Sequence, residues 1–504
     1  MSRELVIWLT IAVYIIFMAV IGLISRKKAK SISDFTVGGR NAGAWVSALS
    51  YGTAYFSAVM FIGYAGKTGW GYGIWGVLVG IGNAVFGSLL AWLLLANRTR
   101  EVTRKLNIKS MPQFFEKRYG SSAMKNFCVA VIFIFLLPYS ASVYNGLTSV
   151  CSVLLGVSEQ VCMIVIAVVA AILVTLGGYI ATLKADFVQG IVMFFGVIFL
   201  IVSVIRCDEV GGISGLIKNM PKISTDLGLG TKQYVGLFAT LIMTSFGTLG
   251  LPQMIHKYYG IKDKQEVKRG TIISTVFALL VAGGGYFIGS LSHLFYSDLG
   301  QLPQGAGNAD YIVPNMLLEA GLPNILLGVV LMLLIAASVS TLSSITITAS
   351  STLTMDMIVP HSKKMSDEKK AAWITKGICI AFIALSYVIA NTKTPILDMM
   401  SYSWGVISGS FLAPYMLALY RKKMNKAAAW AGVLGGFFVA LPPVVCKLFF
   451  NNATLGNFGR IMDMGPHFAV ASMIISLVLC LVVSAVTKPD ANDCAEKFYA
   501  KEAC

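Results

Sequence analysis

The chain has 504 residues, of which 56% are apolar and 12% are charged, and its mean hydropathy is +0.75. No soluble core needs so much apolar sequence, so the composition indicates an all-α, polytopic membrane protein. The net charge of +17 does not indicate a nucleic-acid partner, because the basic residues stand in short gaps between apolar segments. The nine cysteines show no paired spacing and are expected to form neither disulfides nor metal sites.

Apolar segments predict about thirteen transmembrane helices, with boundaries good to several residues. They are 5–25, 42–72, 73–97, 126–155, 160–182, 186–206, 233–255, 270–296, 324–357, 373–391, 396–420, 427–450 and 467–487. Residues 1–487 are therefore expected to form a single transmembrane domain, followed by a tail at 488–504. No small-residue cleavage site follows the first segment, so we expect it to be an uncleaved span.

The basic residues predict the orientation of these spans. With the N-terminus outside, most of the 40 Lys and Arg residues fall in cytoplasmic gaps. If the number of spans before these gaps differed by one, most of the Lys and Arg residues would fall outside instead. We therefore expect a multi-pass protein of the plasma membrane, with an external N-terminus and a cytoplasmic C-terminus.

The second and seventh segments are rich in helix-breaking residues. These are Gly52, Gly63, Gly66, Gly69 and Gly71 in one, and Gly236, Gly247, Gly250 and Pro252 in the other. Both helices are expected to break, although Gly and Pro are also simply common in membrane helices. The two segments are five spans apart, so each opens one half of a five-plus-five repeat. Interrupted helices at matching positions indicate a transport site near the membrane midplane.

A tight turn is predicted at Gly177-Gly178-Tyr179, shortly before Asp186 opens the sixth segment. A carboxylate at this position has two interpretations. It caps a helix N-terminus or pairs with Lys184, or it belongs to a cation site, since a buried carboxylate in a membrane needs a partner.

Hydroxyl side chains crowd the ninth segment from Ser338 to Thr354. Ala337, Ser340, Thr341 and Ser344 share one helical stripe, which offers oxygen atoms to a hard cation. The alternative is that small hydroxyl residues only let membrane helices pack closely.

Several stretches together resemble the sodium:solute symporter family. They are residues 34–40 (Asp-Phe-Thr-Val-Gly-Gly-Arg), 48–57, 177–189, 250–253 (Gly-Leu-Pro-Gln) and Ser340-Thr341. The resemblance covers nearly the whole chain. It implies a LeuT-type inverted repeat over about 42–206 and 233–420, with alternating access to a central site.

The resemblance also implies binding sites. The main sodium site would use the carbonyls of Thr53, Phe56 and Ala337 and the hydroxyls of Ser340 and Thr341. Some members hold a second sodium, and the matching residues here are Asp186, Ser343 and Ser344. The implied solute pocket contains Tyr55, Ser57, Tyr139, Thr244 and Thr248.

The pocket residues argue against some solutes. Proline carriers of this family show Asp in place of Tyr55, and Trp and Tyr in place of Thr244 and Thr248. The context Phe61-Ile62-Gly63 looks more like the pantothenate and monocarboxylate branch. Lys67 either draws an anion inward or extends to the outer interface.

The resemblance predicts a sodium-coupled symporter, not an enzyme, that imports a small carboxylate-bearing solute such as a monocarboxylate, a pantothenate-like acid or an amino acid. The alternatives are a sodium/proline or sodium/sugar symporter, proton coupling, a sensor domain and a passive channel. The expected partners are the solute, sodium and the lipid bilayer, without nucleic acid.

Overall fold

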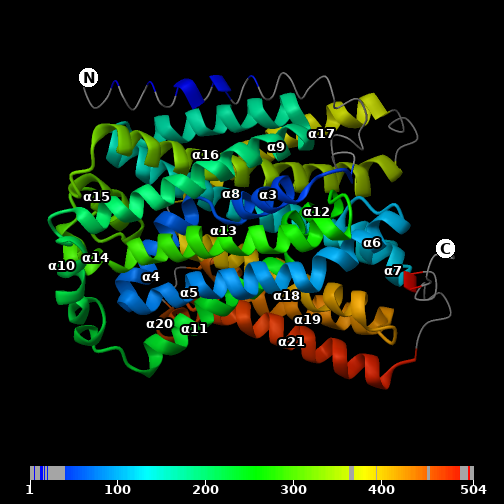
Figure 1. The fold of residues 1–504 in the computed structure, drawn as a ribbon. Coiled ribbons are helices and arrows are strands. Elements are labelled where there is room, and N and C mark those ends of the chain that lie inside the picture. Colours follow the sequence, from blue (N-terminus) through cyan, green and yellow to red (C-terminus); the bar gives the residue numbers. More distant parts are fainter. Residues whose placement is uncertain are drawn as a thin grey trace.

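The computed structural model describes residues 40–361, 368–392, 394–450, 455–488, 498 and 499, and single positions between 5 and 20. Within them the regular structure is helical, apart from one isolated parallel bridge between Ala42 and Ile261. Long helices run side by side, with α10, α14 and α15 at one end of the bundle and α6 and α7 at the other (Figure 1). The predicted first span and the motif at 34–39 lie largely outside the described residues.

The long helices of the bundle are α3 (Ala44–Tyr55), α8 (Ser122–Leu155), α9 (Glu159–Arg206), α11 (Thr231–Phe246), α13 (Lys264–Ser290), α16 (Asn324–Thr352), α17 (Glu368–Ala390), α18 (Ile396–Tyr420), α19 (Lys426–Phe449) and α21 (Gly465–Val486). Shorter helices connect or extend them: α4 (Ala65–Tyr72), α5 (Val77–Gly82), α6 (Asn97–Lys105), α7 (Met111–Tyr119), α10 (Gly212–Lys218), α12 (Pro252–Tyr259), α14 (Ser292–Phe295), α15 (Ile312–Glu319) and α20 (Gly456–Met462). π-helical segments occur at η2 (Val59–Tyr64), η4 (Asn83–Leu90), η5 (Trp92–Ala96) and η11 (Leu353–Ile358). Short 3-10 turns are η3 (Gly73–Gly76), η6 (Met220–Ile223), η7 (Thr225–Leu227), η8 (Gly247–Gly250), η9 (Leu299–Gln301), η10 (Ala309–Tyr311) and η12 (Val359–His361).

Eight helical runs in the described part of the chain are long and apolar enough to cross a membrane, or nine if the bent pair α11 and α12 forms one span. The expectation of an all-α, multi-span protein is confirmed. The count of about thirteen stays a prediction, because the first segment is largely outside the described residues and α3 by itself is only 12 residues long.

A turn at Gly73 separates the second predicted segment from the third. Gly73 has a φ of 55°, a conformation that side-chain-bearing residues rarely adopt. Residues 52–69 run parallel to α13, with Gly52 beside Phe277 and Gly69 beside Gly289. Residues 80–92 run antiparallel to it, with Gly80 beside Ala282 and Trp92 beside Gly270. The chain therefore reverses where the hydropathy pattern placed the boundary.

The fifth and sixth predicted segments form the two arms of α9. In the first arm, the residues near 162 lie beside Ile335 of α16 and Val174 lies beside Ile347. In the second arm, Ala185 lies beside Ala336 and Gly196 lies beside Leu333. The direction of the chain thus reverses near 177–179, although the backbone stays helical there. Asp186 has helical backbone on both sides in the second arm, from Ala181 to Arg206, so the prediction that it caps a helix N-terminus is wrong.

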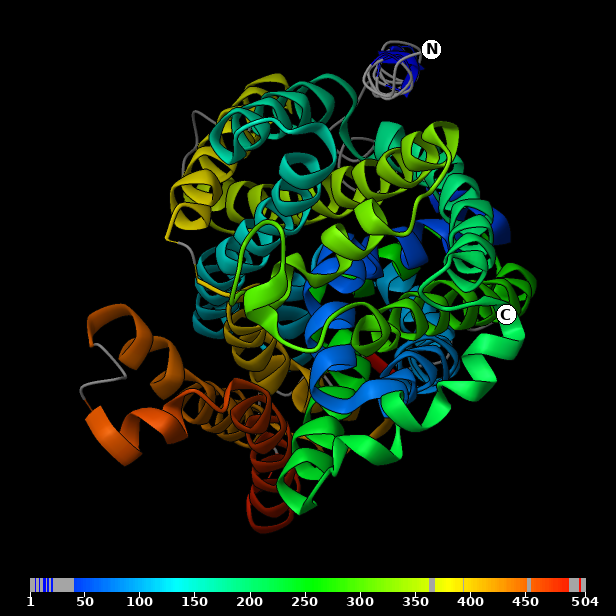
Figure 2. The ribbon, with the colours of Figure 1, turned by 90° about the vertical axis from the view of Figure 1, so that its left-hand side faces the viewer.

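Both predicted helix breaks are present. Helix α3 ends at Tyr55, and Phe56 is extended, with φ −105° and ψ 101°. Helix α11 ends at Phe246, passes through η8 and bends by 46° into α12. Viewed along the bundle, the blue α3 region lies in the middle, while the orange and red helices α19–α21 stand at one side (Figure 2). The breaks therefore occur in the interior, where released backbone groups need new partners.

Candidate functional site

The break after α3 leaves backbone carbonyl oxygens without helical partners. A helix that continued past Tyr55 would use the amide of Ala58 to satisfy the carbonyl of Ala54. That amide instead donates to the hydroxyl of Ser338 on α16, at 3.3 Å. Phe56 is buried and its extended backbone carries the chain away from the helix axis. The end of α3 thus offers carbonyl oxygens in the protein interior.

Helix α16 turns its hydroxyl stripe toward these carbonyls. The Thr341 hydroxyl lies 3.1 Å from the carbonyl oxygen of Thr53 and 3.0 Å from that of Ala337. The Ser340 hydroxyl lies 3.0 Å from Thr53 Oγ1. All four residues are buried. Backbone and hydroxyl oxygens of this kind, converging away from water, are the ligands that a hard cation takes. The structure therefore brings together Thr53, Ala337, Ser340 and Thr341 of the predicted main sodium site, with Phe56 at the adjoining break.

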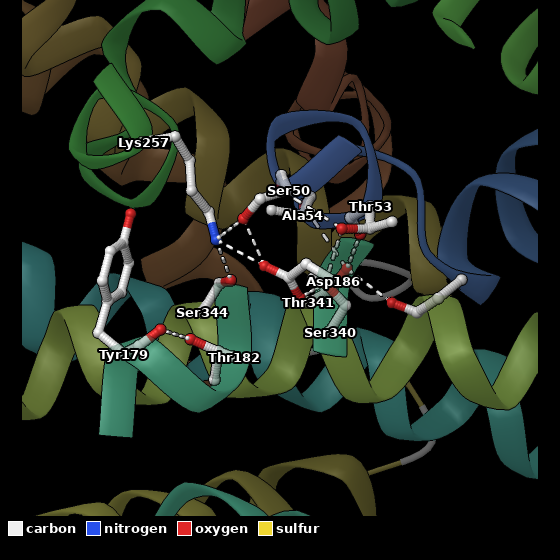
Figure 3. Close-up of polar contacts among 11 residues, drawn as sticks. Ser50, Thr53, Ala54, Tyr179, Thr182, Asp186, Lys257, Ser340, Thr341 and Ser344 are labelled. Atoms are coloured by element: carbon white, nitrogen blue, oxygen red, sulfur yellow. Dashed lines mark hydrogen bonds and ion pairs between the residues drawn. The ribbon is translucent and has the colours of Figure 1, made fainter. Parts of the chain in front are cut away.

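A buried ion pair adjoins this cluster (Figure 3). Lys257 Nζ lies 3.0 Å from Asp186 Oδ2, and both side chains are almost completely buried. Ser50 donates to the same carboxylate oxygen at 2.5 Å, and Ser340 donates to Asp186 Oδ1 at 2.6 Å. Nζ also lies 2.8 Å from Ser50 Oγ and 2.9 Å from Ser344 Oγ. The carboxylate is thus fully engaged by one ammonium and two hydroxyls.

The partner of Asp186 is not the one that the sequence suggested. Lys184 is two residues away in sequence, but the ion pair is formed by Lys257 of α12, in the second broken helix. Ser344 joins this cluster, as the resemblance implied. Ser343 is buried on the same helix, but it makes no hydrogen bond to Asp186 or Lys257 among the described residues.

The aromatic residues of the predicted solute pocket meet around Trp404 of α18. The ring centroid of Trp404 lies 6.2 Å from that of Tyr55 and 5.6 Å from that of Tyr139. The Tyr55 hydroxyl donates to the carbonyl oxygen of Thr244 at 2.6 Å, which joins the end of α3 to α11. Trp404 Nε1 is buried and has no hydrogen-bond partner among the described residues. This donor is available to an oxygen atom of a bound molecule.

The remaining predicted pocket residues have local partners. Ser57 Oγ accepts from the amide of Val59 at 3.3 Å, and the Thr248 hydroxyl donates to the carbonyl of Ser245 at 2.8 Å. Lys67 lies 3.8 Å from Asp398 Oδ1 and its side chain is 40% exposed. The structure therefore places Lys67 in a partly exposed ion pair, and does not bring it to the Trp404 cluster.

Three residues of this region were not singled out in the sequence. Lys257 follows the predicted seventh span, which ends at residue 255, so the sequence places it in a loop. Trp404 stands in an apolar segment without a motif of its own. Asn83 Oδ1, in η4, accepts from the hydroxyls of Thr244 and Ser245 at 2.9 and 3.0 Å. Asn83 could have been recognised in the sequence as an amide side chain inside an apolar segment. Lys257 could have been recognised in the same way if the seventh span had been extended beyond residue 255.

The helices at the two breaks, α3 and α12, contact each other and both contact the hydroxyl-lined α16, which is the arrangement expected of a LeuT-type fold. The chain is similar in structure to a Na+-coupled sialic acid symporter in its substrate-bound outward-open state, with a TM-score of 0.77 and 18% identity, covering 96% of this chain and 98% of that one. It is also similar to MhsT in complex with L-phenylalanine, with a TM-score of 0.52 and 13% identity, covering 88% and 99% of the two chains. These likenesses confirm the predicted fold.

The chain belongs to the sodium:solute symporter family, whose model matches residues 35–436. It is 26% identical to the high-affinity proline transporter PutP of Bacillus subtilis over 490 residues, covering 95% of this chain and 98% of the relative. It is 24% identical to the sodium/pantothenate symporter of Haemophilus influenzae over 494 residues, covering 95% and 94%. The predictions of a sodium-coupled transporter, and not an enzyme, are confirmed at the level of the family.

Proposed function

We propose that this chain imports a small carboxylate-bearing solute together with sodium, which binds between the end of α3 and α16. The observation that carries the proposal is the position of the Thr341 hydroxyl, 3.1 and 3.0 Å from the carbonyl oxygens of Thr53 and Ala337. Sodium would take these oxygens together with Ser340 Oγ and the carbonyl of Phe56. A sodium ion bound to both α3 and α16 stabilises the conformation in which these two helices are in contact.

Sodium binding then supplies the coupling. By tying α3 to α16, the ion favours the outward-open state and raises the affinity for the solute beside the break. The solute must raise the affinity for sodium by the same factor, since coupling between two sites is reciprocal. Release of sodium into the low-sodium cytoplasm would loosen this contact and let the site open inward.

The uncharged aromatic cluster around Trp404 suggests how a carboxylate would be held. Tyr55 and Tyr139 flank Trp404, whose buried Nε1 donor lacks a partner in the described part of the chain. An acceptor group such as a carboxylate oxygen would satisfy it, and the nearby sodium would balance the negative charge. The pantothenate relative is consistent with an organic acid.

The second candidate function is sodium/proline symport. It is favoured by the relatives, which include the Bacillus subtilis transporter and the sodium/proline symporter of Escherichia coli, 26% identical over 452 residues. Proline also carries a carboxylate, so the two candidates differ in the rest of the solute. Tyr55, Thr244 and Thr248 depart from the residues that proline carriers of this family show at these positions.

We further propose that the protein lies in the plasma membrane with α6 and α7 at the cytoplasmic face. This end of the bundle carries Arg40, Arg100 and Arg104, whose guanidinium groups donate to backbone carbonyls of Thr103 in α6 and of Ile108 and Ile261 in neighbouring loops. An excess of arginine and lysine is typical of the cytoplasmic side. This orientation puts the N-terminus outside and the tail after residue 487 inside.

Uptake by purified protein in proteoliposomes tests the proposal. Labelled pantothenate, lactate, acetate, proline and glucose are offered with an inward sodium gradient, and with potassium in its place. We expect one of the acids to accumulate above its external concentration only with sodium. Accumulation of glucose would overturn the solute class, and uptake driven equally well by potassium would overturn sodium coupling.

A further inference from the structure

The ammonium of Lys257 is surrounded by oxygen atoms of the kind that bind a free cation. Its nitrogen lies within 3.0 Å of a carboxylate oxygen of Asp186 and of the hydroxyl oxygens of Ser50 and Ser344. These three contacts match the three N–H donors of an ammonium. Its nitrogen is also 5.4 Å from the centre of the Tyr179 ring, near enough for a cation–π interaction.

The oxygen atoms around Lys257 come from three helices, and Lys257 itself stands on a fourth. Ser50 belongs to α3, Asp186 to α9, Ser344 to α16 and Lys257 itself to α12. Asp186 and Ser344 are also two of the three residues that the family resemblance assigns to a second sodium ion. A sodium ion on these oxygens would have to displace the ammonium or lie directly against it. Two like charges at such a distance, shielded from water, repel strongly.

We propose that the Lys257 ammonium is a tethered cation that fills the second cation site, so that this carrier binds one sodium ion and not two. This inference rests on the proposed function, because it assigns the remaining sodium to the site at Thr341. A carrier with two sodium sites fills the second one with a sodium ion from solution. In this chain the Lys257 side chain supplies that positive charge. One fewer sodium per solute gives a smaller driving force from the same sodium gradient.

The tethered cation also acts on the main site through Asp186. Ser340 donates its single hydroxyl proton to Asp186 Oδ1 at 2.6 Å, which leaves its oxygen lone pairs for other partners. The same oxygen lies 3.0 Å from Thr53 Oγ1, within the proposed sodium cluster. Lys257 and Asp186 are therefore positioning residues for Ser340, in addition to their role as an ion pair.

Counting bound sodium on the purified protein tests the proposal without knowledge of the solute. Equilibrium binding of radioactive sodium in detergent is expected to give one ion per wild-type protein. In Lys257→Met the ammonium is lost, the Asp186 carboxylate remains, and the count should rise toward two. Adding Asp186→Asn should return it to one. Lys264→Met, which removes an exposed lysine at the start of α13, is the matched control and should not change the count.

The outcomes separate this proposal from the proposed function. A wild-type count of two overturns the tethered cation directly, and this measurement needs no variant. If the wild type binds one ion, the Lys257→Met variant decides. A variant that is folded, as judged from its melting curve, and still binds only one sodium ion overturns the tethered cation. A wild type that binds no sodium contradicts the proposed function itself. In proteoliposomes, the sodium-to-solute flux ratio should change in parallel, from one in the wild type toward two in Lys257→Met.

Discussion

Single hydroxyl groups carry much of the proposed sodium site. Thr341 and Ser340 are buried on α16, and each oxygen has an oxygen partner from the α3 side at about hydrogen-bond distance. A buried hydrogen bond contributes about 1 kcal/mol net, so removing either hydroxyl weakens the α3–α16 contact only modestly. Its effect on a cation is larger, because the ion loses a ligand that nothing else in the site replaces.

The variant Ser340→Ala with Thr341→Ala is therefore expected to abolish the stimulation of solute uptake by sodium. Thr348→Ala removes a buried hydroxyl two turns further along the same helix and should keep it. The measurement is the initial rate of uptake in proteoliposomes over a range of sodium concentrations. Full sodium dependence in the double variant would show that the ion binds elsewhere.

Trp404→Phe removes the indole N–H and keeps an aromatic ring. If that donor binds the solute carboxylate, the KM for the solute should rise about 10-fold, since a hydrogen bond to a charged group is worth about 1.5 kcal/mol or more. Trp373→Phe is the control, because Trp373 is 75% exposed. An unchanged KM at saturating sodium would remove Trp404 from the binding site.

At the scale of elements, close helix packing depends on a few glycines. Helices α4 and α13 approach so closely that a Cβ on Gly289 would lie 2.1 Å from the carbonyl oxygen of Ala65. A Cβ on Gly69 would meet the backbone of Gly289 at 2.0 Å. Neither contact can be relieved by rotating a side chain, because the obstacle is backbone. The two glycines therefore set the distance between the first broken helix and α13.

Gly289→Ala should lower the stability of the protein by about 1–3 kcal/mol, the usual cost of forcing extra volume into a packed interior. Gly283→Ala, in the same helix, has open space around the new methyl group and serves as the control. The melting temperatures of the purified proteins in one detergent provide the comparison. Equal melting temperatures would show that the helices can separate without cost.

The N-terminal end of α18 is held by Asp310 of η10. Its Oδ2 accepts from the amide of Ile396 at 3.1 Å, and burial raises the pKa of Asp310 above its ordinary value. A pKa that is higher in the folded than in the unfolded state gives stability at acid pH that is lost as the pH rises through it. Asp310→Asn keeps an acceptor and does not titrate.

The wild type should therefore lose stability between acid and neutral pH, whereas Asp310→Asn should not. The melting temperature of the variant minus that of the wild type should thus be larger at neutral pH than at acid pH. Melting curves at about pH 4 and pH 7 make the test, with Asp298→Asn as the control in an exposed loop. A constant difference between the two proteins over this range would contradict the role of burial at Asp310.

For the whole molecule, the two sites must act as one coupled system. If sodium ties α3 to α16 and so completes the solute pocket, the solute affinity measured with saturating sodium should exceed that without sodium by about 5- to 150-fold. The sodium affinity with saturating solute should improve by the same factor. Titration calorimetry of each ligand with and without the other measures both factors, and unequal factors would exclude this coupling scheme.

Transport rate separates the carrier from a passive channel. A molecule that changes shape for every solute is limited by motions on the microsecond to millisecond scale or slower. Turnover in proteoliposomes should therefore saturate with solute and stay at or below about a thousand per second. Linear, unsaturated flux at much higher rates would favour a pore along the hydroxyl-lined helix.

The amino-acid sequence by itself determined the membrane class, the two helix breaks, the boundary between the second and third segments at residues 72–73, and the hydroxyl stripe of α16. These are local properties: hydropathy, glycine and proline conformation, and helical spacing act over a few residues. Only the tertiary structure decided that Asp186 pairs with Lys257, 71 residues away, and that Trp404 joins Tyr55 and Tyr139. Which charges and rings meet depends on how helices pack, and a long lysine side chain reaches partners that sequence proximity does not indicate.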